Sequence, residues 1–476
     1  MESAKMDRSS KLIVSLLIAV LMGAVDSTIV LLALPTINDS LHTQLSVSIW
    51  IIMIYLLVIA VGTTQLGRLG DLFTRKKIFI SGLGIFTLGS ALCGASGTIL
   101  ELIAFRAFQG VGTAMIQSNS GAIVADNFPP NQRGRVYGYT SVGYNAGAML
   151  GIVLGGIITT FVGWQYIFYI NVPIGIVAIY IGVRYINPGR KVESKLDLPG
   201  MLSLGLALVL ISYAAVDISS YGIRLLNIIL IVAGILSITS FIIIEGRVKK
   251  PLLPMRIFKI RVLSFSLLAS FFQSLGFLAV VFIIIMYLQG VRGLTPFDSS
   301  LLLLPGYLIG SVLGPKFGKL TDRIGARAPA TGGLLMMGVS ILVYSTLTVS
   351  ASLYIILVAS ALTGIGSSMF YPANNSAVMA NSPKDLYGMS SGFLRTMSNI
   401  GMLGSFVISI SIASLSVSRA VAFEVFAGVG KLLGNVSASF MVGIHYSLYV
   451  SLAIIMIGAF LSFVRGKENR QASPNT

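Results

Sequence analysis

The chain is poor in the residues that build catalytic and metal sites. Its 476 residues include one cysteine, Cys93, and two histidines, His42 and His445, which lie far apart in the sequence. A single cysteine cannot form a disulfide framework, and neither histidine has a cysteine or second histidine near it, so no metal site is expected. The Gly-x-x-x-x-Gly-Lys-Ser/Thr loop that cradles the phosphates of ATP is also missing. We therefore expect no enzyme activity, no cofactor and no use of ATP.

Charged residues are scarce as well. They make up 10% of the chain, against 55% hydrophobic residues, and the mean hydropathy is +0.89. A soluble protein carries about 25% charged residues, so this apolar surplus cannot all be core. A membrane-spanning helix needs about 20 mostly apolar residues, and the sequence contains fourteen such runs: 12–34, 47–66, 78–97, 99–123, 136–160, 164–183, 199–217, 225–245, 262–287, 299–315, 328–348, 352–379, 388–413 and 441–464. We therefore expect an all-α integral membrane protein, whose first run is a retained span rather than a cleaved signal peptide.

The net charge of +17 is unevenly distributed among the segments between these runs. If the N-terminus is cytoplasmic, the inner segments hold 27 of the 33 Lys and Arg residues, and the outer segments hold four, namely Arg224, Arg292, Arg419 and Lys431. Cytoplasmic loops of membrane proteins carry such an excess of cations. The basicity therefore indicates topology and not nucleic-acid binding. It predicts a multi-pass protein of the cell membrane, in contact with lipids, with both termini in the cytoplasm.

Two short segments, about half a chain apart, share a pattern of glycines, one aspartate and several cations. Residues 67–77 read GRLGDLFTRKK, and residues 314–327 read GPKFGKLTDRIGAR. They follow the second and the tenth run, and each is too short to span a membrane, so we expect two inner turns. A motif repeated at this distance predicts two related bundles of six spans, which in transporters enclose a binding site at the midplane.

Polar linkers rich in charges and turn formers mark the boundaries of these bundles. We expect an N-terminal six-helix lobe over 1–185, a linker with two inserted spans over 186–261, a C-terminal six-helix lobe over 262–465 and a cytoplasmic tail over 466–476. The outer segment 414–440 is moderately apolar and fits either a hairpin or an interfacial helix.

Further motifs follow along the chain: 26–35 (DSTIVLLALP), 106–112 (RAFQGVG), 151–156 (GIVLGG), 164–175 (WQYIFYINVPIG) and 287–289 (YLQ). Together with the two duplicated segments, they make the chain resemble a member of the major facilitator superfamily, and within it the fourteen-span drug:proton antiporters. The resemblance implies two pseudo-symmetric lobes that rock in alternating access, a proton gradient as the energy source and a monomer as the working unit.

Asp26 is the acid that lies deepest within a predicted span, where a charge costs about 2.5–3.5 kcal/mol. At about 1.5 Å of rise per residue, its depth below the outer end is similar to that of Arg106 in the fourth span, so an ion pair is geometrically possible. Burial favours a protonated carboxylate and a nearby guanidinium favours an ionised one, so movement of the arginine could bind and release a proton. The resemblance ties Arg106 to proton coupling. A static ion pair that joins two spans is the alternative.

The duplicated segments contain the residues that the resemblance assigns to a cytoplasmic latch between the lobes. These residues are Gly67, Asp71, Arg75, Lys76, Gly318, Asp322 and Arg323. A carboxylate is stabilised near a helix N-terminus by the helix dipole, which gives Asp71 a physical role. Thr74 stands where the family usually has a glycine, so a less regular first turn is expected. A basic loop that only sets topology is the alternative.

The fifth predicted span carries glycines at four-residue spacing, which allows close contact between helices. Gly147, Gly151, Gly155 and Gly156 belong to this stripe and resemble the family's motif C. Ile152 stands where the antiporters have a proline, so helix packing alone is the alternative to a role in antiport.

Polar and aromatic residues near the middle of the central spans are candidates for contact with a small-molecule substrate. They are Gln117, Asn145, Gln273, Tyr307, Tyr371, Asn374, Arg395 and Asn399. Polar side chains in membranes usually face the bundle interior, although many only bond neighbouring helices. No acid in the last six spans answers Arg395, which could bind an anionic substrate group, backbone carbonyls or, by snorkelling, lipid headgroups.

The sequence thus predicts a secondary transporter that exports hydrophobic or amphipathic compounds in exchange for protons. The missing proline at position 152 leaves open a facilitator or proton symporter for a metabolite. A membrane receptor or scaffold that has lost transport is an alternative of another class.

Overall fold

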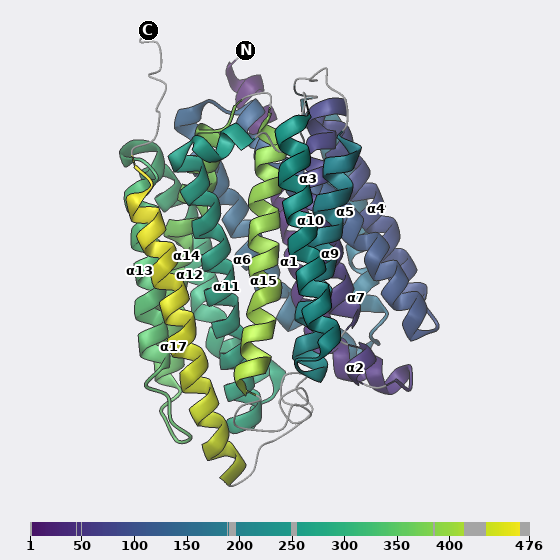
Figure 1. Cartoon of the computed structure of the whole chain (residues 1–476), viewed down its shortest axis with the longest axis vertical. Coiled ribbons are helices and arrows are strands. Elements are labelled where there is room, and N and C mark those ends of the chain that lie inside the picture. The colour runs from purple at the N-terminus through teal and green to yellow at the C-terminus, as the bar shows by residue number, and fades with distance from the viewer. Residues whose placement is uncertain are drawn as a thin grey trace.

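The computed structural model describes residues 2–43, 45–48, 50–187, 189, 197–248, 255–383, 386–413 and 435–466. In these residues the chain forms helices and no strands, as its sequence predicts. Thirteen of the described helical segments are long and apolar enough to cross a membrane, and helix α15 (Tyr387–Ala413) is a further helix of spanning length. Helix α1 begins at the same end of the bundle at which the last helix, α17, finishes (Figure 1).

The helices of the first part of the chain pack mainly with one another, and we call them the N-terminal group. They are α1 (Glu2–Ser40), α2 (Leu45–Ser48), α3 (Trp50–Phe73), α4 (Arg75–Ala95), α5 (Ile99–Asn127), α6 (Pro130–Phe161), α7 (Tyr166–Tyr169) and α8 (Asn171–Tyr185). Helix α1 packs along α6 and α8, and α5 packs along α3 and α4.

The C-terminal group contains the helices from residue 255 onwards. They are η1 (Met255–Lys259), α11 (Arg261–Met286), η2 (Tyr287–Val291), α12 (Pro296–Ile324), α13 (Arg327–Tyr344), α14 (Tyr354–Ala380), α15 and α17 (Asn435–Val464). Helix α11 packs along α15 and α17, and α14 packs along α12 and α13. Of the outer segment 414–440, residues 414–434 lie outside the described residues, and 435–440 are the first turns of α17.

The two groups meet mainly along two pairs of helices, α3 with α15 and α6 with α12, and α5 also contacts α15 while α6 also contacts α14. The inserted helices α9 (Leu198–Tyr221) and α10 (Leu225–Arg247) form a hairpin on the outside of the first pair, where α9 packs against both α3 and α15 (Figure 1). The rings of Trp50 and Tyr213 lie 5.6 Å apart across the contact between α3 and α9. Most of the large apolar side chains of α10 are exposed, as expected for a surface that faces lipid.

The expectation that the duplicated segments form turns is wrong for most of their residues. Helix α3 continues to Phe73 and α12 continues to Ile324, so the motif glycines and aspartates lie on the last turns of helices. The chain turns only at Thr74 in the first segment and at Gly325 and Ala326 in the second. The spacing of four residues between glycine and aspartate is one helical turn, and it puts both on the same face.

The glycine stripe of α6 lies against α1. A Cβ atom on Gly147 would lie 2.4 Å from the carbonyl oxygen of Leu21, and one on Gly151 would lie 2.1 Å from Thr28 Oγ1. Gly155 is buried, and Gly156 lies among the α6 residues whose surroundings are not described. At two of these positions the backbones are therefore too close for any side chain.

Gly147→Ala is expected to destabilise the protein by about 1–3 kcal/mol, the usual cost of overpacking a tight contact. Gly23→Ala is the matched control, because it changes a glycine of α1 whose Cβ would meet nothing within 4 Å. This control should be neutral or stabilising by about 0.4–1 kcal/mol. Thermal unfolding of the two purified variants measures the difference, and equal midpoints would contradict the packing described here.

Candidate functional site

Asp26 on α1 lies in the interior of the N-terminal group with no exposed surface. Its carboxylate accepts hydrogen bonds from Arg106 Nη1 at 2.7 Å, from Gln109 Nε2 at 2.9 Å and from Asn171 Nδ2 at 3.3 Å. Arg106 and Gln109 come from α5, and Asn171 begins α8. The structure thus pairs the two residues that the sequence placed at similar depth, and it adds two amide donors to the carboxylate.

Arg106 is 1% exposed and is held by several groups besides Asp26. Its Nη1 also donates to Gln109 Oε1 at 2.6 Å, and its Nε donates to the carbonyl oxygen of Ile51 at 3.2 Å. The guanidinium carbon lies 4.0 Å from the centre of the Tyr55 ring, within the range of a cation–π contact. Loss of one partner from a buried ion pair typically costs about 3–5 kcal/mol, since the other charge is left without compensation.

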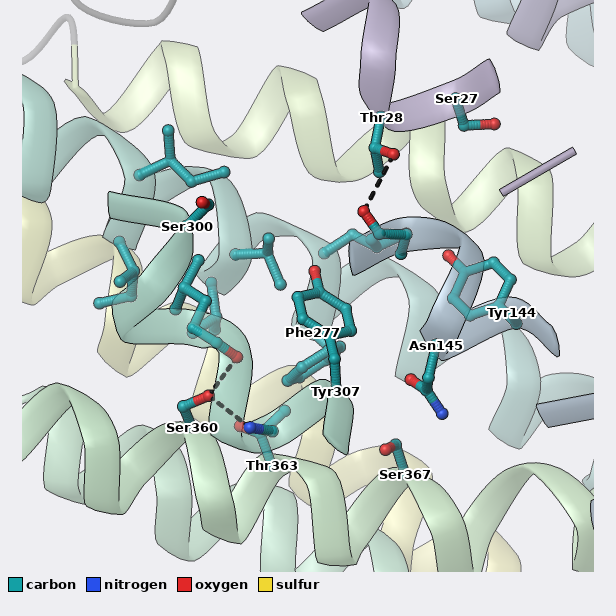
Figure 2. Close-up of a pocket in the computed structure, with 18 of the residues that line it drawn as sticks. Ser27, Thr28, Tyr144, Asn145, Phe277, Ser300, Tyr307, Ser360, Thr363 and Ser367 are labelled. Atoms are coloured by element: carbon teal, nitrogen blue, oxygen red, sulfur yellow. Dashed lines mark hydrogen bonds between the residues drawn. The ribbon is translucent and has the colours of Figure 1, made fainter. Parts of the chain in front are cut away.

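A cavity of about 220 Å³ lies between the two groups of helices, and Arg106 forms part of its wall. Figure 2 shows Ser27, Thr28, Tyr144 and Asn145 of the N-terminal group opposite residues of α11, α12 and α14. Five tyrosines belong to the wall: Tyr55, Tyr144, Tyr307, Tyr344 and Tyr371. Among the described lining residues Arg106 is the one charged side chain, and it is already paired. The cavity therefore combines aromatic surface with hydroxyl and amide groups.

Three of the eight predicted substrate contacts line this cavity, namely Asn145, Tyr307 and Tyr371. Gln273 lies behind the wall and donates to the Tyr371 hydroxyl at 3.0 Å. Asn374 is turned elsewhere, with its Nδ2 donating to the Ser266 carbonyl at 3.1 Å and its Oδ1 accepting from Arg465 at 3.4 Å. Gln117, Arg395 and Asn399 are not part of the cavity wall.

At the end of α3, Asp71 joins the N-terminal group to the C-terminal group. Its carboxylate accepts hydrogen bonds from the backbone N–H groups of Gly388 and Met389, both at 2.9 Å, at the start of α15. Arg75 donates to the same carboxylate at 2.6 Å and also bonds Asp126. A helix N-terminus offers unpaired N–H groups and a partial positive charge. Asp71 therefore caps a helix that belongs to the other half of the molecule.

Asp322 of α12 makes the equivalent contact in the opposite direction. It accepts hydrogen bonds from the backbone N–H groups of Gly134 at 2.8 Å and Arg135 at 3.0 Å, in the first turns of α6. One turn earlier, a Cβ on Gly318 would lie 2.2 Å from the Gly134 carbonyl oxygen. In the first contact, a Cβ on Gly67 would lie 2.4 Å from the Gly388 carbonyl oxygen. Both joints thus consist of a glycine contact and a carboxylate cap one turn later.

The cations of the duplicated segments have different surroundings. Lys76 donates to the Val183 carbonyl at 2.6 Å, and Lys11 of α1 lies over the neighbouring Tyr185 ring at 5.1 Å. The joint at Asp71 therefore lies at the end of the bundle where α1 begins. Arg323 is exposed. Thr74 has φ 155° and ψ 139°, a backbone conformation that suits glycine far better than threonine.

Several residues of the site carried no assigned role in the sequence. Gln109 follows Arg106 by three positions, so their shared helix face could have indicated it. Asn171 is 145 residues away from Asp26 along the chain, and Gly388 and Gly134 are 317 and 188 residues away from the aspartates that bind them. Only the packing of the helices brings these groups together.

The family model that describes the Major Facilitator Superfamily matches residues 16–405. The chain is 31% identical to the multidrug transporter protein MdtP of Bacillus subtilis, over 85% of this chain and 76% of that protein. It is 29% identical to the tetracenomycin C resistance and export protein of Streptomyces glaucescens, over 83% and 74%. It is 28% identical to the riboflavin transporter RibZ of Clostridioides difficile, over 96% and 97%.

Among solved structures, the human organic anion transporter MFSD10 (TETRAN) has the same fold. The TM-score is 0.66 at 13% sequence identity, over 95% of this chain and 99% of that chain. The helical architecture, the cavity between two groups of helices and the family match lead to one assignment. The chain belongs to the Major Facilitator Superfamily and is a multi-pass membrane transporter of small molecules.

Proposed function

We propose that this transporter exports hydrophobic or amphipathic small molecules across the cell membrane in exchange for protons. The observation that carries the proposal is the Asp26–Arg106 pair, fully buried and in contact with the cavity through Arg106. A buried carboxylate that can lose its cationic partner is a site at which a proton can bind and leave. No cofactor is needed for this cycle, because the proton gradient supplies the energy.

In the proposed coupling step, Arg106 moves away from Asp26 and the carboxylate takes up a proton. The residues around the pair allow such an exchange of partners. Each charged group has partners besides the other one: Gln109 and Asn171 donate to the carboxylate, and the Tyr55 ring and the Ile51 carbonyl contact the guanidinium. Neither group would therefore lose all its partners when the ion pair separates. Because Arg106 lines the cavity, a substrate that displaces its side chain would change the charge balance at Asp26.

Alternating access in this proposal is rocking of the two groups as six-helix lobes, with the two carboxylate caps as the inner latch. In this proposal the end that Asp71 and Asp322 close, each by binding the backbone of the opposite group, is the inner end. Opening the inner end must break both caps and the two glycine contacts. Each cap is made of charge-assisted hydrogen bonds, which contribute about 1.5–3 kcal/mol apiece.

The substrate class follows from the cavity wall. Five tyrosines supply flat apolar surface together with hydroxyl groups, and no carboxylate among the described lining residues would attract a permanent cation. Two similar proteins are named for multidrug transport and for export of tetracenomycin C. These names support export as the direction of transport and drugs as the substrates.

A second candidate function is transport of a metabolite by the same fold, by facilitation or proton symport. The similarity to a riboflavin transporter over nearly the full length of both chains favours it, as does Ile152 in place of the motif C proline. The direction of proton movement separates the two: opposite to the substrate for export by antiport, and the same as the substrate for symport.

Asp26→Asn is expected to abolish transport-linked proton movement, because a carboxamide does not gain or lose a proton near neutral pH. In vesicles that contain the purified protein, addition of the neutral dye Nile red should change the internal pH with the native protein. The initial rate of that change should fall at least tenfold in the variant. Asp39→Asn, which changes an exposed acid at the outer end of α1, is the control and should behave like the native protein. Unaltered proton movement in Asp26→Asn would refute the coupling role and leave a static ion pair.

Asp71→Asn is expected to shift the protein towards an inward-open state, because the cap on α15 loses its charge. The reporter is Ser391→Cys in a Cys93→Ser background, since Ser391 is 3% exposed and lies against Gly121 beneath the inner closure. Labelling by a maleimide should become at least tenfold faster. The matched control is Asp217→Asn, which breaks the ion pair with Arg224 at the tip of the α9–α10 hairpin. Equal labelling rates in both variants would contradict the latch and indicate that the duplicated segment only sets the topology of the chain.

A further inference from the structure

Arg395 is a cation in the middle of α15 to which the proposed mechanism gives no task. It lies on α15 and is partly exposed. In the described part of the chain it forms neither an ion pair nor a hydrogen bond as donor, whereas Arg106 and Arg75 are both paired with carboxylates. A guanidinium inside a membrane bundle raises the free energy of the folded protein unless it has a partner. The accessible charge of Arg395, which has no ion-pair partner in the described part of the chain, therefore requires an explanation.

The surroundings of Arg395 place it beside the transport cavity. Met402 lies two turns from Arg395 on the same face of α15 and belongs to the cavity wall. Tyr137, Tyr144 and Tyr371 lie within electrostatic range of the guanidinium. Tyr137 lies deeper, and its hydroxyl donates to the Gly121 carbonyl at 3.0 Å. Arg395 therefore lies just beneath the cavity, among tyrosines from α6 and α14.

A second polar group on the same helix face also lacks an acceptor. Asn399 is one turn from Arg395, is 7% exposed, and its Nδ2 has no hydrogen-bond partner in the described part of the chain. Met402, almost one turn further, belongs to the cavity wall. The other side of α15 is fully engaged, since Thr396 bonds Thr63 and Thr64 across the contact with α3. Arg395 and Asn399 thus present donors without a partner among the described residues, on the face of α15 that continues to Met402 of the cavity wall.

From this juxtaposition we propose that Arg395, assisted by Asn399, binds an acidic group of the substrate, so that the transported molecules include aromatic carboxylates. The proposal rests on the proposed transport function and narrows its substrate class. The rings of the cavity would take the aromatic part of the molecule, by stacking or edge contacts. The planar guanidinium can bind a carboxylate through two parallel hydrogen bonds. Arg395 is then a specificity-determining residue for acidic substrates.

The experiment compares equilibrium binding of 9-anthracenecarboxylate and the neutral 9-anthracenecarboxamide to the full chain in phosphatidylcholine nanodiscs, read from the fluorescence of the probe. The native protein should bind the carboxylate at least tenfold more tightly than the amide. Arg395→Gln should lose this preference and keep its affinity for the amide within about twofold, which also shows that the variant is folded. Arg395→Lys should keep part of the preference. Arg247→Gln, which removes an exposed cation at the end of α10, should keep all of it.

Three results would overturn the proposal: a native protein that binds the two probes equally or binds neither, a preference that persists in Arg395→Gln, or carboxylate binding that is lost when phosphatidylglycerol is added to the nanodiscs. The last result would assign Arg395 to lipid headgroups. The measurement uses no pH gradient, so failure of proton coupling would not change it. A transporter without proton coupling could still show the predicted preference, and a proton-coupled one could lack it.

Discussion

A charge inside a bilayer is stable only where protein groups replace water, and this requirement determines how the helices of the chain can be arranged. Asp26 needs Arg106, and Arg106 needs Asp26, so α1 and α5 are held at one relative height. Gln109 and Asn171 then fix the rotation of α5 and the start of α8 around the same carboxylate. The glycine stripe of α6 packs α1 from another side. The N-terminal group is thus organised around one ion pair.

The same principle operates differently where the two groups meet. There the carboxylates of Asp71 and Asp322 are satisfied by backbone N–H groups at the starts of α15 and α6. Such contacts are strong when made and can be replaced by water when broken, because they lie at the ends of helices. In the proposed transport cycle the ion pair deep in the bundle keeps the N-terminal group rigid, and the two caps break when the groups separate. The α9–α10 hairpin packs against the α3–α15 pair and not against the α6–α12 pair. The two joints have the same geometry, but only the Asp71 joint belongs to a helix pair that this hairpin covers.

The helical architecture could be predicted from the sequence, because long apolar runs and the distribution of cations follow directly from the bilayer. The depth of Asp26 and Arg106 was accessible too, since it depends only on the rise per residue along straight helices. The turns expected at 67–77 and 314–327 were wrong for most of their residues. Glycines and cations in a sequence favour a loop, and the sequence does not show that Asp71 and Asp322 each cap a helix of the other group. Asn374 was chosen for its mid-span polarity, but its side chain bonds Ser266 and Arg465 instead of lining the cavity. The polarity of a residue alone does not determine whether its side chain faces the cavity or a neighbouring helix.

The positions of Arg106 and Arg395 constrain how proton and substrate would be coupled in the proposed mechanism. Arg395 lies seven residues, about 10 Å, from Gly388 in the inner joint and the same distance from Met402 in the cavity wall. Arg106 lies on α5, and its side chain contacts Asp26, Gln109, Ile51, Tyr55 and Phe168. A substrate acid held at Arg395 would therefore not need to touch the proton site. Since α15 carries both Arg395 and the backbone N–H groups capped by Asp71, movement of this helix would release the Asp71 cap and move the proposed substrate-binding charge together. Coupling between proton and substrate would then pass through the relative movement of the lobes and not through direct contact between the two charges.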